Sequence, residues 1–191
     1  MRLRLSSIVA LSLLQVCSPA SPVALVRAGS GWNFPLVEGK GYSGVIVPAQ
    51  RAKGFAEAIG VVCDYWTPTP ELIAKLESRL RPALETAVTS PESVTYFPAG
   101  NAERASYVTA ELAKTLDHFA KYKRQYVGII LPDGSRRILV NCFDCWQDLC
   151  ANWRKRLVVV NGGGYHFWRI QFEVATELFQ DFESNGHHRT V

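Results

Sequence analysis

The cysteines are the residues of this chain whose types and spacing could carry chemistry. Five are present, and Cys142, Cys145 and Cys150 lie close together in the C-terminal third. The segment Cys142-Phe143-Asp144-Cys145 is a C-x-x-C motif, which in thiol oxidoreductases stands at a helix N-terminus that lowers the pKa of one thiol. The βαβ pattern that accompanies such a motif is missing from the sequence. A thiol-active enzyme centred on Cys142 and Cys145 is therefore an alternative hypothesis.

Disulfide bonds are the leading interpretation of the cysteines. Cys63, Cys142, Cys145 and Cys150 remain in the chain after any export signal is removed. An even number of cysteines in an exported protein favours disulfides, and four cysteines allow three pairings. We expect two bridges, one of which joins Cys63 to a member of the C-terminal cluster. A zinc site would need a second C-x-x-C or an H-x-x-x-H pair, so no metal or other cofactor is predicted.

The histidines and glycines have structural explanations that need no ligand. His118 lies beside the apolar face of a predicted helix, and no second metal ligand stands at helical spacing from it. His187 and His188 are adjacent, so their side chains point apart in a terminal tail. The glycines of residues 162–164 suit a tight hairpin, because no Lys-Ser or Lys-Thr pair follows them to complete a phosphate-binding loop.

A group of carboxylates near the C-terminus contains the best acid–base candidates. Charged outer faces of exposed sheets look the same in sequence, and nothing here indicates a pocket that would raise a pKa. No Gly-x-Ser-x-Gly elbow is present. We interpret the group as solvated surface and predict no catalytic residue. The four carboxylates are Glu173, Glu177, Asp181 and Glu183.

The first residues have the form of a secretory signal. Arg2 and Arg4 make a basic region, and residues 5–16 make an apolar one. This apolar run is shorter than the roughly 20 residues that a transmembrane helix needs. Small residues suitable for cleavage follow. We therefore expect residues 1–28 to be a signal peptide and the protein to be periplasmic or extracellular. The candidate cleavage positions are Ala20, Ala24 and Ala28.

Cys17 offers a second reading of the N-terminal segment. It follows Leu14-Gln15-Val16, which is similar in part to the lipidation signal of bacterial lipoproteins. The position suits a lipid anchor, whereas Val16 is too bulky for the usual cleavage position. Contact with a membrane is expected only if Cys17 is lipidated.

The net charge gives little reason to expect a nucleic-acid partner. The whole chain of 191 residues carries a formal charge of +4. Removing Arg2 and Arg4 leaves +2, and removing Arg27 as well leaves +1. Three basic clusters, at residues 121–124, 136–137 and 154–156, lie among acidic residues. They are expected to be solvent-facing, and no nucleic acid is predicted as a partner.

Two helices are expected before the main run of strands. The first starts at Thr69-Pro70-Glu71, where Thr69 can cap and Pro70 suits the first helical position. Pro82 should kink or break this helix. The second helix should span about residues 103–124. The first helix repeats an apolar residue every four positions on one face, at Leu72, Leu76, Leu80 and Leu84.

The strands are expected mainly in the C-terminal half. A hairpin should join residues 126–131 and 136–143 around the turn Pro132-Asp133-Gly134-Ser135. A short helix within residues 144–154 should precede a second hairpin of residues 157–160 and 165–174. A final strand is expected at residues 178–182. Shorter strands are expected at residues 42–47 and 60–66, with one or two helical turns between them.

These elements predict an α+β fold. Helices followed by antiparallel strands indicate two helices packed on one curved antiparallel sheet of about four to five strands. Residues 60–191 should form this single domain, and residues 29–59 should form a linker or N-terminal arm. The order is similar to cystatin-like rolls by fold analogy. The C-terminal half also resembles uncharacterised secreted bacterial proteins, in the phrases around residues 123–128 and 140–143 and in the glycine-rich turn before residues 166–168.

The leading functional hypothesis is a non-enzymatic exported domain that binds a protein or small ligand through its sheet face or loops. An inhibitor of a hydrolase is one form of it, because residues 125–128 half resemble the Gln-x-Val-x-Gly inhibitory hairpin of cystatin-like proteins. The first alternative is a thiol-active or metal-dependent enzyme centred on Cys142 and Cys145. The second is a structural envelope component, for which a Cys17 anchor is the discriminating feature.

Overall fold

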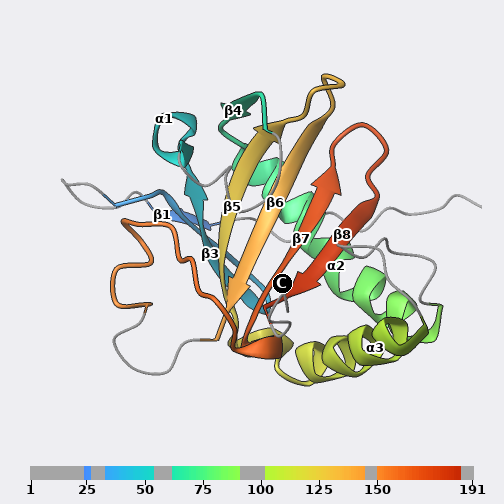
Figure 1. Cartoon of the computed structure of the whole chain (residues 1–191). Helices are drawn as coiled ribbons and strands as arrows, with labels where there is room; N and C mark the ends of the chain where they lie inside the picture. The colour runs from blue at the N-terminus through green and yellow to red at the C-terminus, as the bar shows by residue number, and fades with distance from the viewer. Residues whose placement is uncertain (1–23, 27–32, 54–61, 91–101, 145–149, 186–191) are drawn as a thin grey trace, which may run out of the picture.

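The fold is α+β, as the sequence predicted, and its sheet is larger than the four or five strands expected. The computed structural model describes residues 24–26, 33–53, 62–90, 102–144 and 150–185. Within these residues, eight strands form one mixed sheet, and helices α2 (Pro70–Thr89) and α3 (Ala102–Asp117) lie on one side of it. Figure 1 shows α2 running diagonally behind the sheet toward α3.

The sheet is built around the long central strand β5 (Lys123–Ile130). Strand β3 (Tyr42–Val47) pairs in parallel with the first part of β5, and β4 (Asp64–Trp66) pairs antiparallel with its last part. On the other side of β5 all pairings are antiparallel. The order across the sheet ends with β6 (Arg136–Phe143), β7 (Phe167–Glu173) and β8 (Phe179–Ser184).

The segment expected to be a linker or arm belongs to the sheet, and it contains the strand expected at residues 42–47, which is β3, and a helical turn after it, as expected. Within residues 29–59, β2 (Leu36–Gly39) pairs with β3, and a short helix α1 (Ala49–Ala52) follows. Val37 and Val45 are fully buried. Strand β1 (Ala24–Val26), inside the segment expected to be a signal peptide, pairs with β2. Val37 of β2 and Val45 of β3 are therefore part of the core.

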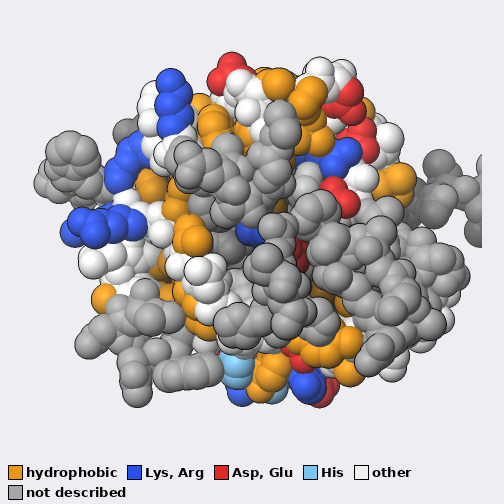
Figure 2. All heavy atoms as spheres, viewed as in Figure 1, with side chains coloured by type: hydrophobic (Ala, Val, Ile, Leu, Met, Phe, Trp, Pro, Cys, Tyr) orange, Lys and Arg blue, Asp and Glu red, His pale blue; other side chains and the backbone are white. Residues whose placement is uncertain are grey.

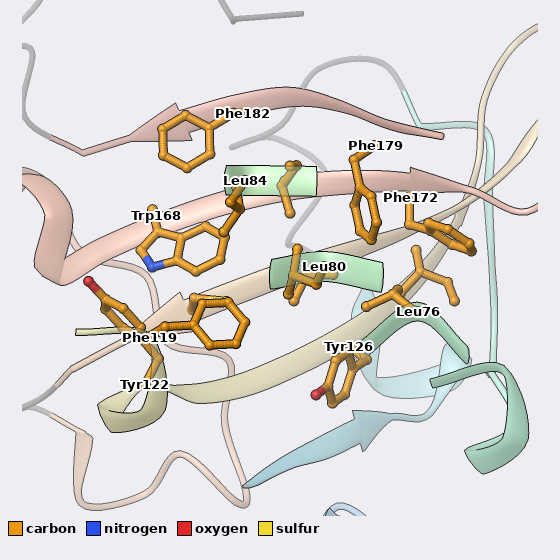
Figure 3. Close-up of a cluster of buried hydrophobic side chains, with 14 of the residues drawn as sticks. Leu76, Leu80, Leu84, Phe119, Tyr122, Tyr126, Trp168, Phe172, Phe179 and Phe182 are labelled. Atoms are coloured by element: carbon orange, nitrogen blue, oxygen red, sulfur yellow. The ribbon is translucent and has the colours of Figure 1, made fainter. Parts of the chain in front are cut away.

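Helix α2 begins where the sequence predicted and packs with the predicted face. The Oγ1 of Thr69 accepts a hydrogen bond from the Leu72 amide at 3.4 Å. Leu76, Leu80 and Leu84 are fully buried, and Figure 3 shows them among aromatic side chains from the sheet. The predicted break at Pro82 does not occur, because α2 continues through it to Thr89. The burial of apolar side chains on both sides of Pro82 offsets the single lost backbone hydrogen bond.

The second helix ends earlier than the sequence predicted. Helix α3 stops at Asp117, a 3₁₀ turn η3 (Phe119–Lys121) follows, and β5 begins at Lys123. Lys123 pairs with Ser43 of β3 and with Phe143 of β6. Pairing with strands on both sides satisfies the backbone hydrogen-bonding groups of this segment. The helical pattern of the sequence does not show that these strand partners are available.

The first predicted hairpin is confirmed and the second is wrong. Strands β5 and β6 join through the predicted turn, where Gly134 takes a φ of 81°. Residues 157–160 form no strand, and β7 pairs with β6 instead. The three glycines of the expected hairpin turn all have positive φ and lead into a 3₁₀ turn η5 (Gly164–His166). The final predicted strand is present as β8, shifted by one residue at its start.

Gln125 explains why residues 157–160 lie across the sheet rather than in it. Its side chain is fully buried on the sheet face opposite the helices. The amide nitrogen donates to the carbonyls of Trp153 and Arg156, both at 2.7 Å, and the amide oxygen accepts from the Val158 backbone at 2.9 Å. Asn141 donates to the Val158 carbonyl at 2.9 Å. Side chains from β5 and β6 thus satisfy the backbone that a strand partner would otherwise satisfy.

A buried ion pair lies between α2 and β5. Nε of Arg124 is 3.2 Å from Oε1 of Glu77, and both side chains are at most 2% exposed. Tyr126 donates its hydroxyl to the same carboxylate oxygen at 2.8 Å. The guanidinium also donates to the carbonyls of Tyr122 and Phe119. Burial raises the pKa of Glu77, while Arg124 and the Tyr126 hydroxyl act in the opposite direction.

Removing the carboxylate of Glu77 should destabilise the whole domain. Glu77→Ala leaves the Arg124 guanidinium buried without its counter-charge, which costs about 3–5 kcal/mol in comparable pairs. The free energy of unfolding, measured by denaturant titration, should fall by that amount. Glu85→Ala is the matched control, because Glu85 pairs with Arg81 on the same helix but is 52% exposed. Its loss should be no more than about 0.5 kcal/mol. Equal losses in the two variants would show that the buried pair has no special role.

Candidate binding groove

The cysteines do not form the two bridges expected. Cys63 is an exposed free thiol and Cys142 is a buried free thiol. Cys150 is not a free thiol, and Cys145 and Cys17 lie outside the described residues. With Cys63 and Cys142 both unpaired, the four expected bridging cysteines can form at most one bridge among themselves. The predicted link from Cys63 to the C-terminal cluster is therefore absent.

Cys142 is unsuited to the chemistry of a C-x-x-C motif. It lies within β6 rather than at a helix N-terminus, and its side chain is fully buried in the core beneath the helices. Burial disfavours the thiolate and raises the pKa of the thiol far above its ordinary value, although Arg124 opposes this rise. Because the thiolate is the nucleophile in thiol chemistry, the position is structural rather than reactive.

The motif proposed for an inhibitory hairpin is also internal. Gln125, Tyr126 and Val127 are fully buried in the central strand. Gly128 lies against β4, where an added Cβ would stand 2.3 Å from the Trp66 carbonyl oxygen. These residues build the sheet and cannot contact a hydrolase as an exposed hairpin would. The resemblance to the inhibitory motif therefore has no functional counterpart in the fold.

His118 and His166 lie close to the ring of Tyr165 near the end of α3. The ring of Tyr165 lies 5.0 Å from that of His118 and 4.1 Å from that of His166. His118 donates from Nδ1 to the Lys114 carbonyl at 3.0 Å, since a carbonyl can only accept. Nδ1 of His166 is 3.7 Å from a carboxylate oxygen of Asp144. The cluster joins the end of α3 to η5, and sequence spacing did not reveal it because His118 and Tyr165 are far apart along the chain.

Metal binding finds no support within the described residues. They contain no group of three or more histidine, cysteine, aspartate or glutamate side chains placed to hold an ion. His187 and His188 lie outside them, as does Cys145. None of the described helices is both long and apolar enough to cross a membrane.

The carboxylates near the C-terminus, predicted to be solvated surface, are half-buried and have separate partners. Asp181 pairs with Arg137 at 3.1 Å, and Glu183 pairs with Arg169 at 2.6 Å. Glu173 accepts a hydrogen bond from Gln180 at 3.2 Å. Each carboxylate is paired locally, so no shared acid–base site arises from them. Glu177 differs from the other three because it lies at the edge of a groove.

The α2–β8 groove is the candidate functional site. It is open to solvent and has a volume of about 340 Å³. One wall comes from α2, and the other comes from the β7–β8 turn and the start of β8. Apolar side chains dominate its surface, and Leu178 stands 61% exposed at its rim. The groove is lined by Ser78, Arg79, Pro82, Ala83, Thr86, Glu177, Leu178 and Phe179.

Ion pairs hold the β7–β8 turn beside α2. The carboxylate of Glu177 binds both Lys75 and Arg79 of α2, one on each oxygen. Glu177 has a φ of 59°, in the left-handed region that residues with a Cβ rarely adopt. Its amide donates to the Glu173 carbonyl at 2.9 Å, and the Glu173 amide donates to the Leu178 carbonyl at 2.9 Å. The turn therefore presents Leu178 in a defined position.

The surface charge is mixed rather than concentrated in one sign. On the face shown in Figure 2, basic and acidic side chains both appear among apolar ones. Two members of the basic clusters have internal roles, since Arg124 is fully buried and Arg137 bonds Asp181. The guanidinium of Arg136 lies 3.9 Å from the centre of the Trp66 ring. Three arginines of the basic clusters are therefore engaged in contacts within the fold.

Thiol labelling should separate the two free cysteines. Iodoacetamide applied to the folded protein should modify Cys63 and spare Cys142, because only Cys63 is exposed. Unfolding in urea should make Cys142 reactive as well. The measurement is peptide mass after each treatment, with Cys63→Ser as the control that removes the native signal from this pair. Modification of Cys142 in the folded state would contradict its assignment to the core.

The Glu177 ion pairs should give the groove a defined response to acid. Hydrogen bonding and charge attraction from Lys75, followed by the effect of Arg79, lower the pKa of Glu177 below its ordinary value of 4.5. The stabilisation is thus fully present above pH 4.5 and is lost as the pH falls through the lowered value. The Leu178 methyl resonances should follow this titration in an NMR series. Glu177→Gln should remove it, and a midpoint at or above 4.5 in the unaltered protein would contradict the ion pairs.

Comparison with known proteins adds nothing to the description of the groove. No family model, no curated protein and no solved structure matches this chain. The groove was not apparent from sequence, because its two walls are about a hundred residues apart along the chain, as the Lys75–Glu177 contact shows. The only local signs of the groove in the sequence are Pro82 inside a predicted helix and the pair Glu177-Leu178.

Proposed function

We propose that this chain is an exported binding domain that holds a partner protein at the α2–β8 groove. The observation that carries the proposal is the groove itself, an open apolar hollow beside a large apolar side chain that is exposed to solvent. Exposed apolar surface rimmed by polar and charged groups is typical of protein interaction sites. Pro82, Ala83, Leu178 and Phe179 supply that surface, and Arg79 and Glu177 form part of its rim.

Rigidity of the groove supports a binding role. Leu178 belongs to a turn that is held by two ion pairs and two backbone hydrogen bonds. Phe179 beside it is anchored in the core against Phe172, with ring centres 5.0 Å apart. A surface that is already ordered loses less conformational entropy when a partner binds. The groove can therefore contribute affinity from a small contact area.

The N-terminal sequence pattern and the burial of Cys142 complete the support for the proposal. The basic residues and short apolar run at the N-terminus favour export, which would place the groove in the periplasm or outside the cell. The alternative of a thiol enzyme loses support because Cys142 is buried with a raised pKa. The partner is a protein rather than a nucleic acid, because the mature chain has little net charge and its surface charges are mixed.

Site-specific photo-crosslinking in the producing cells tests this function. Benzoylphenylalanine in place of Leu178 should capture a partner protein, and the same residue in place of Val159 should not. Val159 is the matched control because it is apolar and 62% exposed, against 61% for Leu178. Ala83→Trp fills the groove and should reduce the Leu178 adduct by about tenfold, as expected when a central contact of an interface is lost.

Two results would contradict the proposed function. One is an equal yield of adducts at positions 159 and 178, which would indicate non-specific contact with apolar surface. The other is an adduct at position 178 that survives Ala83→Trp unchanged. Circular dichroism of each variant establishes that the fold is retained. Detection of the mature N-terminus by mass spectrometry in the same preparation tests export separately.

A further inference from the structure

We infer that the occupant of the α2–β8 groove is an extended segment of the partner polypeptide, added as a strand along β8. This inference rests on the proposed function and specifies how the partner binds. The segment carries an apolar side chain that enters the groove and an acidic group that meets Lys75 and Arg79. Three features of the described residues lead to this chemistry: an open sheet edge, an apolar hollow beside it, and unequal charge at its mouth.

The open edge is strand β8. It pairs with β7 on one side, and no described strand pairs with its other side. An edge strand presents backbone donors and acceptors to any chain that can extend beside it. Natural edges are usually protected by lysine, proline or a bulge. The first two residues of β8, Phe179 and Gln180, are uncharged and include no proline, whereas the charged residues Asp181 and Glu183 come later in the strand.

A bulge limits where on β8 the added strand can lie. The β7–β8 register shifts between Arg169 and Gln171, and Asp181 has a φ of 55°. This irregularity interrupts regular pairing in the middle of β8. The first residues, Phe179 and Gln180, keep regular pairing with β7 and adjoin the groove. Docking is therefore placed at the beginning of β8, where the edge and the groove meet.

Helix α2 provides the opposite wall for the added strand. Figure 1 shows α2 passing behind the sheet and emerging beyond β8. Pro82 lines the groove and has no amide hydrogen, so the Ser78 carbonyl receives no hydrogen bond from the position where a helix would normally supply one. The groove volume of about 340 Å³ accommodates an apolar side chain together with the backbone that carries it.

The charge at the opening of the groove indicates which residue should stand next to the apolar residue of the bound segment. Lys75 and Arg79 share the single carboxylate of Glu177, which leaves an excess of one positive charge. Their side chains are 51% and 45% exposed, so an incoming carboxylate can reach them without desolvating a buried ion. An aspartate or glutamate next to the apolar residue satisfies this excess. A basic segment would be repelled.

The test begins with a phage-displayed library of random twelve-residue peptides, selected on the full mature protein. Selected peptides should combine an apolar residue with an adjacent Asp or Glu. Their binding should shift the NMR signals of residues 177–180 and of the α2 residues that line the groove. Ala83→Trp should abolish these shifts. Lys75→Gln should weaken binding at low salt, whereas Arg81→Gln should not, although both positions are about half exposed and ion-paired.

Methylation of the peptide backbone distinguishes strand addition from side-chain binding alone. In an extended strand, alternate amides face the sheet edge, so two peptides methylated in the two alternating registers form a matched pair. One register should weaken binding by about tenfold through the loss of backbone hydrogen bonds. The other register should bind within about twofold of the unmodified peptide, since its methyl groups face away from β8.

Several outcomes would overturn the inference while leaving the proposed function intact. Equal binding of both methylated peptides would mean that only a side chain is recognised. Failure to select any peptide, while the Leu178 adduct still depends on an open groove, would mean that the partner presents a folded surface. Concentration-dependent dimerisation abolished by Ala83→Trp would identify a second copy of this chain as the occupant. Loss of the groove-dependent Leu178 adduct itself would instead remove the proposed function.

Discussion

The buried ion pair between Glu77 and Arg124 is the constraint on which the arrangement of helix and sheet depends. Two charges removed from water are tolerated only when they stay paired and hydrogen-bonded. Tyr126 and the carbonyls of Phe119 and Tyr122 add hydrogen bonds to the pair. The apolar leucines of α2 would accept small shifts along the sheet, whereas the carboxylate must face the guanidinium. The pair therefore sets where α2 crosses β5, and with it the position of the groove wall near β8.

A second polar anchor organises the opposite face of the sheet. Gln125 and Asn141 bind the backbone of residues 153–158, which covers an apolar cluster that includes Val127 and Leu139. Neighbouring residues of β5 thus serve opposite faces, as the alternation of a strand requires. Within the described residues, each face of the central strands is covered by packed chain. The groove beside the edge strand β8 leaves apolar surface open next to the exposed Leu178.

The cysteine, histidine and glutamate residues that could carry chemistry occupy different environments in the fold. Cys142 is in the core, where its environment suppresses the thiolate. The histidines His118 and His166 come together around Tyr165, where they tie α3 to the end of the sheet. Glu177, one of four carboxylates assigned to solvated surface, instead holds the turn that presents Leu178. Its importance comes from geometry, because two cations on α2 converge on it and fix a backbone conformation that is otherwise unfavourable.

The sequence alone determined the helices and turns that depend only on residues close together along the chain. The Thr69 cap, the repeated leucines of α2, and the β5–β6 hairpin with its Asp133-Gly134 turn all formed as expected, because each depends on nearby backbone and side-chain geometry. Only the tertiary structure decided the rest. Residues 36–47 joined the sheet through a parallel pairing with β5, and residues 157–160 were held across it by Gln125 rather than paired in a hairpin. The groove likewise depends on contacts between Lys75, Arg79 and Glu177, and no local pattern encodes a contact between segments so distant along the chain.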